Sequence, residues 1–260
     1  KTLKFLLLLN KDKKTMINKE KLKTEIYKLS ALTDRGQRLN KLISPIYQEK
    51  LIEINKIINN LKDYSEPITE DNISGEWELI FSNVELFRSS PFFLAIEHAL
   101  NDKVKSDLFF KLHQLQVSSF GLSTIGKISQ KIDFQKKEFI SSFDTIIFGI
   151  TTIPIFGWFK LLPTFGGSVT TLADELVLDD KKIKMSLQKT KVTEVEGLNK
   201  IPLFSKLLMN KWYPVKDVWR KLPWNKFNPK CEVSIIFIDE ELRIMNDIYG
   251  SIFIYIRPNK

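Results

Sequence analysis

The chain has 260 residues, of which 43% are hydrophobic and 27% are charged. This composition is typical of a globular protein with room for one large or two small domains, and it excludes disorder, collagen and coiled coil. A single cysteine, Cys231, excludes an internal disulfide, and two histidines are too few for a Cys/His zinc site. We therefore expect a core held by packing alone, with no metal and no cofactor.

The formal net charge of +9 is unevenly distributed along the chain. Residues 1–62 hold 15 basic and 6 acidic side chains, whereas residues 63–260 hold 25 of each. Within the second part, residues 200–230 hold eight basic side chains, one acid and three of the five tryptophans. Basic surfaces of this kind permit contact with nucleic acid or an anionic membrane, and they are also typical of a solvated helix face.

The first part of the chain has a helical pattern. Residues 1–15 include an apolar run too short to span a membrane, and we interpret them as a targeting remnant or as disordered. In residues 16–62, leucine and isoleucine recur at spacings of three and four between polar residues, which indicates amphipathic helices. A break at residues 33–36 predicts a helical hairpin of about residues 17–31 and 38–62. The polar residues 63–74 follow as a linker.

After the linker, polar and apolar residues alternate with the period of a β-strand. No helix of βαβ length separates these runs, so we predict a mainly β fold: an antiparallel, lipocalin-like β-barrel over residues 75–258, preceded by the helical region. One short helix is expected at residues 92–100, after Ser90 and Pro91. The predicted strands are 75–82, 125–134, 138–147, 168–172, 175–178, 182–193, 232–238, 242–246 and 250–257.

Residues 145–159 carry no charge and are rich in isoleucine and phenylalanine. A transmembrane helix needs about twenty such residues, and Gly149, Pro154 and Gly157 interrupt this stretch. We therefore interpret it as strand and loop that line an apolar cavity or touch lipid.

The sequence lacks the familiar catalytic motifs: the nucleophile elbow, the phosphate-binding P-loop, the dinucleotide-binding glycine turn and the His-Glu-x-x-His zinc helix. His98 and His113 have no neighbouring nucleophile, and a surface or structural role is the simpler expectation for both. Cys231 begins an apolar strand, where a buried free thiol is usual. We predict that the protein is not an enzyme.

The basic, aromatic residues 200–230 have three interpretations. They fit the stacking of single-stranded nucleic acid, a membrane contact with tryptophan at headgroup level, or packing over the mouth of the barrel. Their apolar content favours a membrane over nucleic acid, while the packing interpretation stays open. The predicted membrane contact consists of Lys211, Trp212, Lys216, Trp219, Arg220, Lys221 and Trp224.

An ordered set of motifs runs from the helical region to the last strand. It comprises Leu32-Thr33-Asp34-Arg35-Gly36, Gly75-Glu76-Trp77-Glu78-Leu79-Ile80-Phe81, Leu86-Phe87-Arg88-Ser89-Ser90-Pro91-Phe92-Phe93, Pro163-Thr164-Phe165-Gly166-Gly167, Leu222-Pro223-Trp224-Asn225-Lys226 and Phe253-Ile254-Tyr255-Ile256-Arg257-Pro258. With these motifs, the chain resembles the plastid lipid-associated proteins, also called plastid fibrillins.

The resemblance implies a lipocalin-like barrel that holds or contacts carotenoids, quinones and other prenyl lipids. It also implies a plastid location, on the stroma-facing side of thylakoids or on the lipid droplets called plastoglobules, and it brings no catalytic residues. In such barrels a Gly-x-Trp motif lies at the closed end, where an arginine from a late strand covers the indole. Structural roles for Gly75, Trp77 and Arg257, with the last two as a cation–π pair, follow from the resemblance.

We therefore predict a non-enzymatic protein whose partners are a hydrophobic isoprenoid or lipid ligand and a membrane or lipid-droplet surface, with no nucleic acid and with any protein partner unidentified. The alternative is a structural coat or scaffold on lipid droplets that contacts a prenyl-lipid enzyme and has no internal ligand. A shift of the alternation by one residue would turn the predicted interior positions outward. These ligand-binding positions are Leu79, Phe81, Ile128, Ile132, Phe143, Met185 and Leu187.

Overall fold

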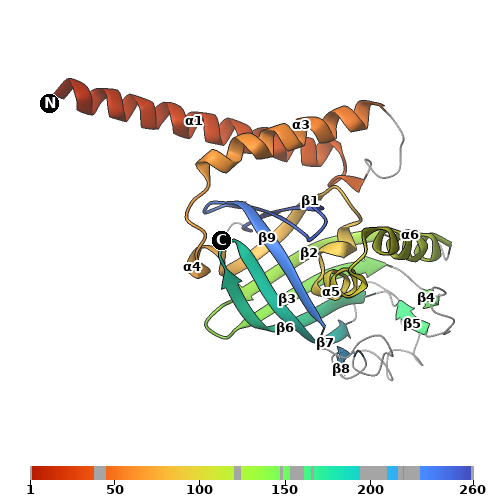
Figure 1. Ribbon diagram of the computed structural model, residues 1–260. Coiled ribbons are helices and arrows are strands. Elements are labelled where there is room, and N and C mark those ends of the chain that lie inside the picture. The colour runs from red at the N-terminus through yellow and green to blue at the C-terminus, as the bar shows by residue number, and fades with distance from the viewer. Residues whose placement is uncertain are drawn as a thin grey trace.

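The computed structural model (Figure 1) describes residues 2–37, 45–119, 124–146, 149–152, 161–164, 167–193, 210–215, 219 and 229–258. Its helices are α1 (Thr2–Leu32), α3 (Pro45–Leu61), η1 (Lys62–Tyr64), α4 (Glu70–Ile73), η2 (Leu86–Ser89), α5 (Pro91–Leu100) and α6 (Lys103–Ser119). Its strands are β1 (Gly75–Ser82), β2 (Thr124–Asp133), β3 (Glu138–Ile146), β4 (Gly149–Thr152), β5 (Leu161–Thr164), β6 (Gly167–Asp179), β7 (Lys182–Thr193), β8 (Trp212–Pro214), β9 (Lys230–Ile238), β10 (Leu242–Asn246) and β11 (Ile252–Ile256).

Eight strands form a closed antiparallel barrel in the order β1, β11, β10, β9, β7, β6, β3 and β2, with β2 returning to β1. The long β6–β7 pairing completes the ring, so these strands present no open edge to pairing with another chain. Strand β8 adds to β7 outside the ring, and β4 and β5 form a separate ribbon. The predicted antiparallel barrel preceded by a helical region is confirmed.

Short turns with aspartate at their start connect the last three strands. Asp239 Oδ1 accepts hydrogen bonds from the N–H groups of Glu241 and Leu242 at 2.9 and 2.7 Å. Asp247 Oδ1 likewise accepts from the N–H groups of Tyr249 and Ser251 at 2.9 and 2.8 Å. A carboxylate that binds nearby backbone donors in this way stabilises a tight turn, and both hairpin connections lie where the sequence places them.

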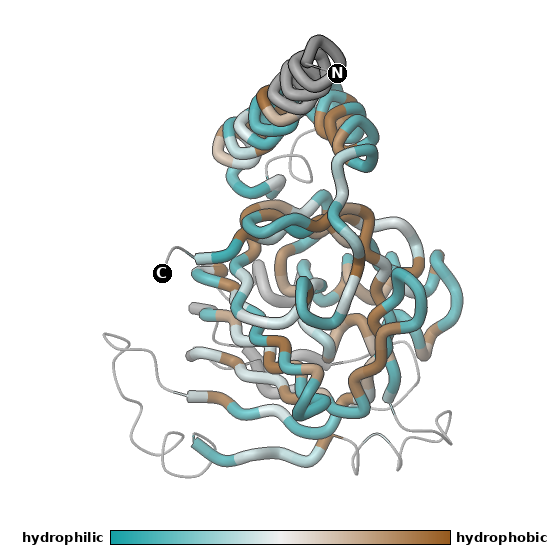
Figure 2. The backbone as a smooth tube through the Cα atoms, turned by 90° about the vertical axis from the view of Figure 1, so that its left-hand side faces the viewer, coloured by the Kyte–Doolittle hydropathy of each residue, from teal (hydrophilic) through white to brown (hydrophobic). Residues whose placement is uncertain are grey.

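Helices α1 and α3 lie against each other on the outside of the barrel wall (Figures 1 and 2). Helix α1 begins at Thr2, well before the predicted start near residue 17, because no proline or glycine interrupts residues 2–32. The structure thus gives residues 2–15 a helical backbone, and the targeting role stays a prediction. Residues 38–44, where the second predicted helix begins, lie outside the described residues.

The barrel wall beneath these helices is apolar on both faces. Besides the cluster inside the barrel, a second buried cluster joins the two helices to the outer face of β1, β9, β10 and β11. It consists of Ile26, Leu29, Ile54, Ile57, Ile58, Leu61, Phe81, Phe237, Leu242, Ile244, Ile252 and Ile254. The ends of β1 and β9 and most of β10 and β11 are therefore apolar on both faces, and the helices are part of the fold.

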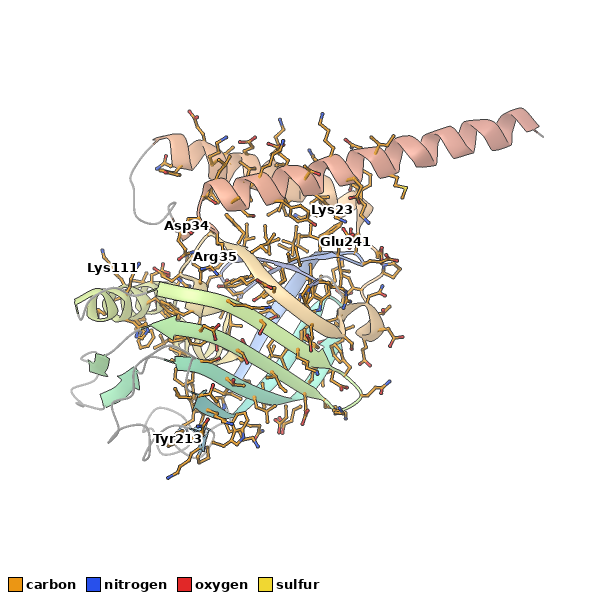
Figure 3. All side chains as sticks on the ribbon, turned by 180° about the vertical axis from the view of Figure 1, so that it is seen from behind. Lys23, Asp34, Arg35, Lys111, Tyr213 and Glu241 are labelled. Carbon is orange, nitrogen blue, oxygen red and sulfur yellow. The ribbon has the colours of Figure 1, made fainter. Side chains whose placement is uncertain are left out.

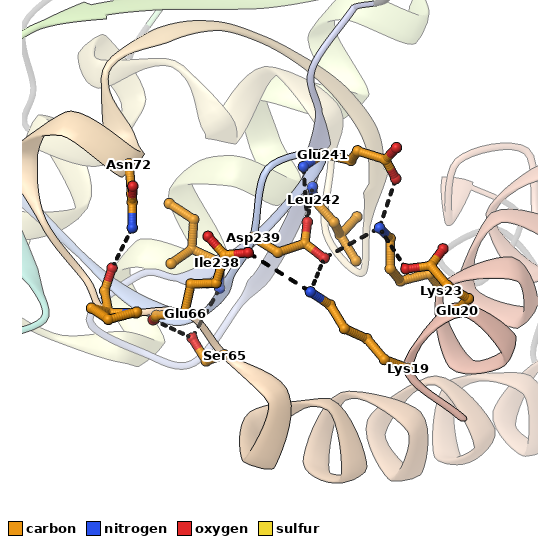
Figure 4. Close-up of polar contacts among 11 residues, drawn as sticks. Lys19, Glu20, Lys23, Ser65, Glu66, Asn72, Ile238, Asp239, Glu241 and Leu242 are labelled. Atoms are coloured by element: carbon orange, nitrogen blue, oxygen red, sulfur yellow. Dashed lines mark hydrogen bonds and ion pairs between the residues drawn. The ribbon is translucent and has the colours of Figure 1, made fainter. Parts of the chain in front are cut away.

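Buried ion pairs fix the direction of α1 on the barrel (Figure 4). Lys19 Nζ and Lys23 Nζ lie 2.8 and 3.2 Å from Asp239 Oδ2, and Lys23 Nζ donates to Glu241 Oε2 at 2.6 Å. Burial alone would lower the pKa of Lys23, but Glu241 and Asp239 raise it above its ordinary value. Burial opposes the ionised form of Asp239 as well, yet Lys19 and the turn N–H groups hold its pKa below the ordinary value. The turn that starts β10 is thus also the anchor of the helix.

The segment after α1 forms hydrogen bonds with the end of β1 and the start of β2 (Figure 3). Arg35 donates to the carbonyl oxygens of Ile125 and Gly126 at 2.6 and 2.7 Å, where a bulge interrupts the β2–β3 pairing. The carbonyl of Arg35 accepts from the N–H of Ser82 at 3.0 Å. Gly36 has φ +85°, and a Cβ there would lie 1.9 Å from the Ser82 carbonyl oxygen. The Thr-Asp-Arg-Gly motif is therefore a backbone junction between helix and barrel.

Replacement of Gly36 tests this junction, and Gly250 offers a matched control. Gly250 has φ +86°, and a Cβ there would meet nothing within 4 Å, so Gly250→Ala carries only backbone strain, about 1–2 kcal/mol. Gly36→Ala adds the collision with Ser82, and we expect it to lower the free energy of unfolding by about 1–3 kcal/mol more than the control. Chemical denaturation measures both variants. Equal losses would show that close approach at Gly36 does not matter.

Candidate functional site

The interior of the barrel holds six of the seven predicted ligand-binding positions. These six side chains are all buried in one apolar cluster that spans β1, β2, β3 and β7. They are Leu79, Ile128, Ile132, Phe143, Met185 and Leu187. Their inward direction follows from the strand alternation, while their role in ligand binding stays a prediction.

Phe81 is the exception, and its predicted interior position is wrong. In the β1–β11 pairing, Leu79 faces Tyr255 whereas Phe81 faces Ile254, so the register shifts between the two β1 residues. Such a β-bulge adds one residue to a strand and reverses the faces beyond it. Leu79 and Tyr255 consequently belong to the interior cluster, and Phe81 and Ile254 belong to the cluster under the helices.

Side chains of η2 and α5 contribute to the same interior cluster, a feature that the sequence did not predict. Leu86, Phe87, Phe93, Leu94 and Ala95 are buried there, and α5 contacts β9, β6 and β7. Phe87 and Phe93 also form ring contacts with Phe110 and His113 of α6. Burial lowers the pKa of His113 to about 4, so the imidazole is neutral near neutral pH. The η2–α5 segment is thus an internal wall of the barrel.

The Trp77 indole lies between two guanidinium groups. Arg257 lies over the ring at 4.1 Å, which is the contact implied by the family resemblance, and Arg243 lies over it at 4.7 Å. Arg257 donates to the carbonyl oxygens of Asn72 and Ser74, and the indole N–H donates to Ile73 at 2.8 Å. The chain just before β1 is thereby tied to the end of the barrel.

Gly75 is required by the same arrangement. Its φ is +116°, and a Cβ there would lie 2.4 Å from Nη1 of Arg257. Any other residue would therefore strain the backbone and displace the arginine from the indole. The structural roles that the resemblance implies for Gly75, Trp77 and Arg257 agree with these contacts.

A cluster of three buried side chains, Arg88, Glu97 and Asp247, lies between α5 and the β10–β11 turn. Arg88 Nη2 donates to Glu97 Oε1 at 2.8 Å, and both side chains are buried. The Glu97 carboxyl also lies within hydrogen-bonding reach of Asp247, whose buried Oδ2 has no other hydrogen-bond partner among the described residues. Burial and the Asp247 carboxylate raise the pKa of Glu97 to about 8, although Arg88 opposes the shift. A protonated Glu97 supplies the donor that Asp247 Oδ2 lacks.

The predicted membrane contact is only partly described. Lys211 is exposed, and Trp212 is 43% exposed with Lys189 Nζ and Lys191 Nζ at 4.8 and 5.9 Å from its ring. Trp219 is 6% exposed and packs in the interior cluster, so it cannot reach a membrane surface as predicted. Its position fits the packing interpretation. The other four predicted membrane-contact residues lie outside the described residues: Lys216, Arg220, Lys221 and Trp224. Most of residues 145–159 also lie outside them, as do all side chains of that stretch.

Other candidate chemistry is confined to isolated groups. Among the described residues, no three His, Cys, Asp or Glu side chains are placed to hold a metal ion. Burial raises the pKa of the Cys231 thiol to about 12, which makes it unreactive. In the described part of the chain, no helix has both the length and the apolar character that a membrane crossing needs.

The residues that the sequence interpretation missed are polar and interior: Arg88, Glu97, Gln130, Arg243, Asp247 and Tyr255. One signal was available, because Arg243 stands between Leu242 and Ile244 in a strand whose other residues are nearly all apolar. A charged residue in such a run is seldom on a solvated face. Tyr255 is its neighbour across the β10–β11 hairpin, but its partners Trp77 and Gln130 come from distant strands and could not be inferred.

The fold and its interior define a closed, lipocalin-like β-barrel with an apolar core, carrying helices on its outer wall. A family model described as PAP_fibrillin matches residues 20–256, and the chain belongs to this family of plastid lipid-associated proteins, a structural, lipid-associated family. No curated protein and no solved structure matches the chain.

The shared proton of Glu97 predicts how stability depends on pH. Because folding raises this pKa from 4.5 to about 8, the folded state binds more protons than the unfolded state between these values, and stability falls as pH rises through them. His113 has the opposite effect, but only below its unfolded value of 6.5. We therefore expect the free energy of unfolding to fall between about pH 6.5 and about pH 8.5.

Glu97→Gln should remove that slope, because the amide can donate to Asp247 and still accept from Arg88 at every pH. Glu85→Gln is the matched control, since Glu85 lies 3.7 Å from the other end of Arg88 and should leave the slope unchanged. Urea unfolding across this range measures all three proteins. A slope that persists in Glu97→Gln contradicts the shared proton.

Proposed function

We propose that the protein is a non-enzymatic plastid protein that binds hydrophobic small molecules, such as carotenoids, quinones and other prenyl lipids, in its barrel and associates with thylakoid or plastoglobule surfaces. The observation that carries the proposal is the apolar cluster enclosed by a closed barrel in a chain of this family. Binding would draw on apolar burial, about 25 cal/mol per Å² of surface removed from water.

The position of η2 and α5 suggests how a ligand is accommodated. Phe87, Phe93 and Leu94 occupy interior volume between the same walls that would contact an isoprenoid chain. An entering ligand therefore displaces this segment and replaces its apolar contacts. Side-chain contacts among Arg88, Glu97 and Asp247 join this segment to the β10–β11 turn. Its displacement would break these contacts and leave the backbone hydrogen bonds between the barrel strands intact.

An interior-filling variant tests the container. Ala173, fully buried in the interior on β6, and Val177, 50% exposed on the same strand, form a matched pair. We expect a prenylated benzoquinone to quench the fluorescence of the buried Trp77 and Trp219 at micromolar concentration. Ala173→Leu should weaken the affinity measured by this quenching at least about tenfold, because the larger side chain occupies interior space that the ligand needs. Val177→Leu should leave the affinity unchanged.

Quenching in the wild-type protein alone decides whether the barrel binds a ligand, so the test holds even if Ala173→Leu does not fold. Absence of quenching in the wild type contradicts the container. That result would favour the alternative, a coat or scaffold without an internal ligand. The side chains of η2 and α5 also favour this alternative, because they occupy interior space.

The membrane-facing part of the proposal rests on Trp212 and its neighbours. An exposed tryptophan beside Lys189, Lys191 and Lys211 fits the headgroup region of an anionic membrane, where each lysine near the surface contributes about 1 kcal/mol. Replacement of these three lysines by glutamate should abolish pelleting with anionic liposomes and spare quinone quenching. Pelleting that survives places the membrane contact elsewhere.

A control with the same charge change is available on the β2–β3 hairpin. Lys131, Lys136 and Lys137 are exposed there, and their replacement by glutamate should reduce pelleting only through net charge. Equal losses in the two triple variants would show that overall charge, and no particular surface, determines membrane binding.

A further inference from the structure

The interior of the barrel contains a buried positive charge. Arg243 is 0% exposed, and its guanidinium lies between the rings of Trp77 and Tyr255, at 4.7 and 4.6 Å. Aromatic faces attract a cation but do not neutralise it. Burial lowers the pKa of Arg243 to about 9, which shows how strongly the site disfavours the uncompensated charge.

No acid compensates this charge among the residues that the structure describes. The charged or ionisable groups that act on Arg243 are Tyr255 and a second cation, Arg257, on the other face of Trp77. Its Nη2 donates to Gln130 Oε1, while its Nε and Nη1 are buried without a hydrogen-bond partner in the described part of the chain. Buried charged donors are nearly always paired, so two unpaired donors on one guanidinium call for an acceptor.

A neighbouring side chain has the same deficiency. Ser141 on β3 pairs in register with Gln130 on β2, and its buried Oγ also finds no hydrogen-bond partner among the residues described. From the η2–α5 wall, the Ser89 carbonyl accepts from Gln130 Nε2 at a long 3.4 Å, whereas Tyr255 Oη accepts from the same nitrogen at 2.7 Å. Arg243, Gln130, Ser141 and Tyr255 thus form a buried polar layer, in which three donors lack an acceptor among the described residues.

We propose that Arg243 is the head-group site of the interior ligand, and that the ligand is an amphiphile with an anionic oxygen head, a carboxylate or a phosphate, on an apolar tail. This inference rests on the proposed internal binding and specifies the ligand class. The head accepts from Nε and Nη1 of Arg243 and from Ser141, and it replaces the Ser89 carbonyl at Gln130. The tail lies among the interior side chains, beginning at Leu79, which pairs in register with Tyr255.

Charge-assisted hydrogen bonds from a desolvated guanidinium strongly favour an anion over a neutral group of similar size. A pure hydrocarbon such as a carotene would fill the apolar volume but leave Arg243 uncompensated. The structure thus points to acidic lipids over hydrocarbons within the ligand class that the family suggests.

Matched probes test the proposal on the wild-type protein. A medium-chain fatty acid, the alcohol of the same chain and the monoalkyl phosphate of the same chain compete with the quinone probe at about pH 7, where both acids are ionised. We expect the fatty acid or the phosphate to bind at least about tenfold more tightly than the alcohol, and their order identifies the head. Equal affinities for all three overturn the head-group site while internal binding stands. If none competes and the quinone does not bind, internal binding and the head-group site both fail.

Variants assign the preference to this arginine. Arg243→Gln should reduce the affinity for the acid at least about tenfold and leave the alcohol unchanged, and Arg243→Lys should retain a preference for the acid. Arg257→Gln, which removes the other cation on the same indole, is the matched control and should keep the preference. If Arg243→Gln does not fold, Ser141→Ala replaces it, with a smaller selective loss for the acid. An unchanged preference in Arg243→Gln, or in Ser141→Ala where it replaces that variant, contradicts the assignment.

Discussion

The sandwich of Trp77 between Arg257 and Arg243 is the interaction on which the rest of the barrel depends. One indole brings together β1, β10, the chain before β1 and the first residue after β11, and the indole N–H donates to the carbonyl of Ile73 at the end of α4. Gly75 must be glycine because Arg257 occupies the space of its side chain. Arg257 binds two backbone carbonyls, whereas Arg243 binds none among the residues that the structure describes. The same indole therefore supports a structural contact on one face and an unsatisfied charge on the other.

The bulge in β1 has consequences for both faces of the wall. By reversing the alternation after Leu79, it turns Phe81 towards the helices and lets β1 contribute to two cores. The outer core then requires α1 and α3 as its cover, and Lys19 and Lys23 of α1 are used by Asp239. Part of the positive charge of residues 1–62 is thus engaged in folding, and that charge is not a free basic arm.

Sequence patterns located most of the strands and six interior positions, because alternation and local turn chemistry determine them, whereas the Trp77–Arg257 contact was implied only by the family resemblance. They failed where a single residue changes the register, as at Phe81, and where a buried residue lies in a basic, aromatic run, as at Trp219. They also missed the interior polar layer. Arg243 and Tyr255 face each other across the β10–β11 hairpin, but Gln130 of β2 joins them only when the barrel closes, and periodicity carries no information about that pairing.

The wall formed by η2 and α5 determines what a ligand can gain inside the barrel. A tail that displaces Phe87, Phe93 and Leu94 exchanges one set of apolar contacts for another, so the net gain from its burial is small compared with entry into an empty cavity. The head group gains more, because the described wall residues that reach the polar layer contact Gln130 and Tyr255 and leave Nε and Nη1 of Arg243 without an acceptor. Selectivity in this barrel is consequently expected to depend on the head group, while the tail chiefly sets how far the wall must move.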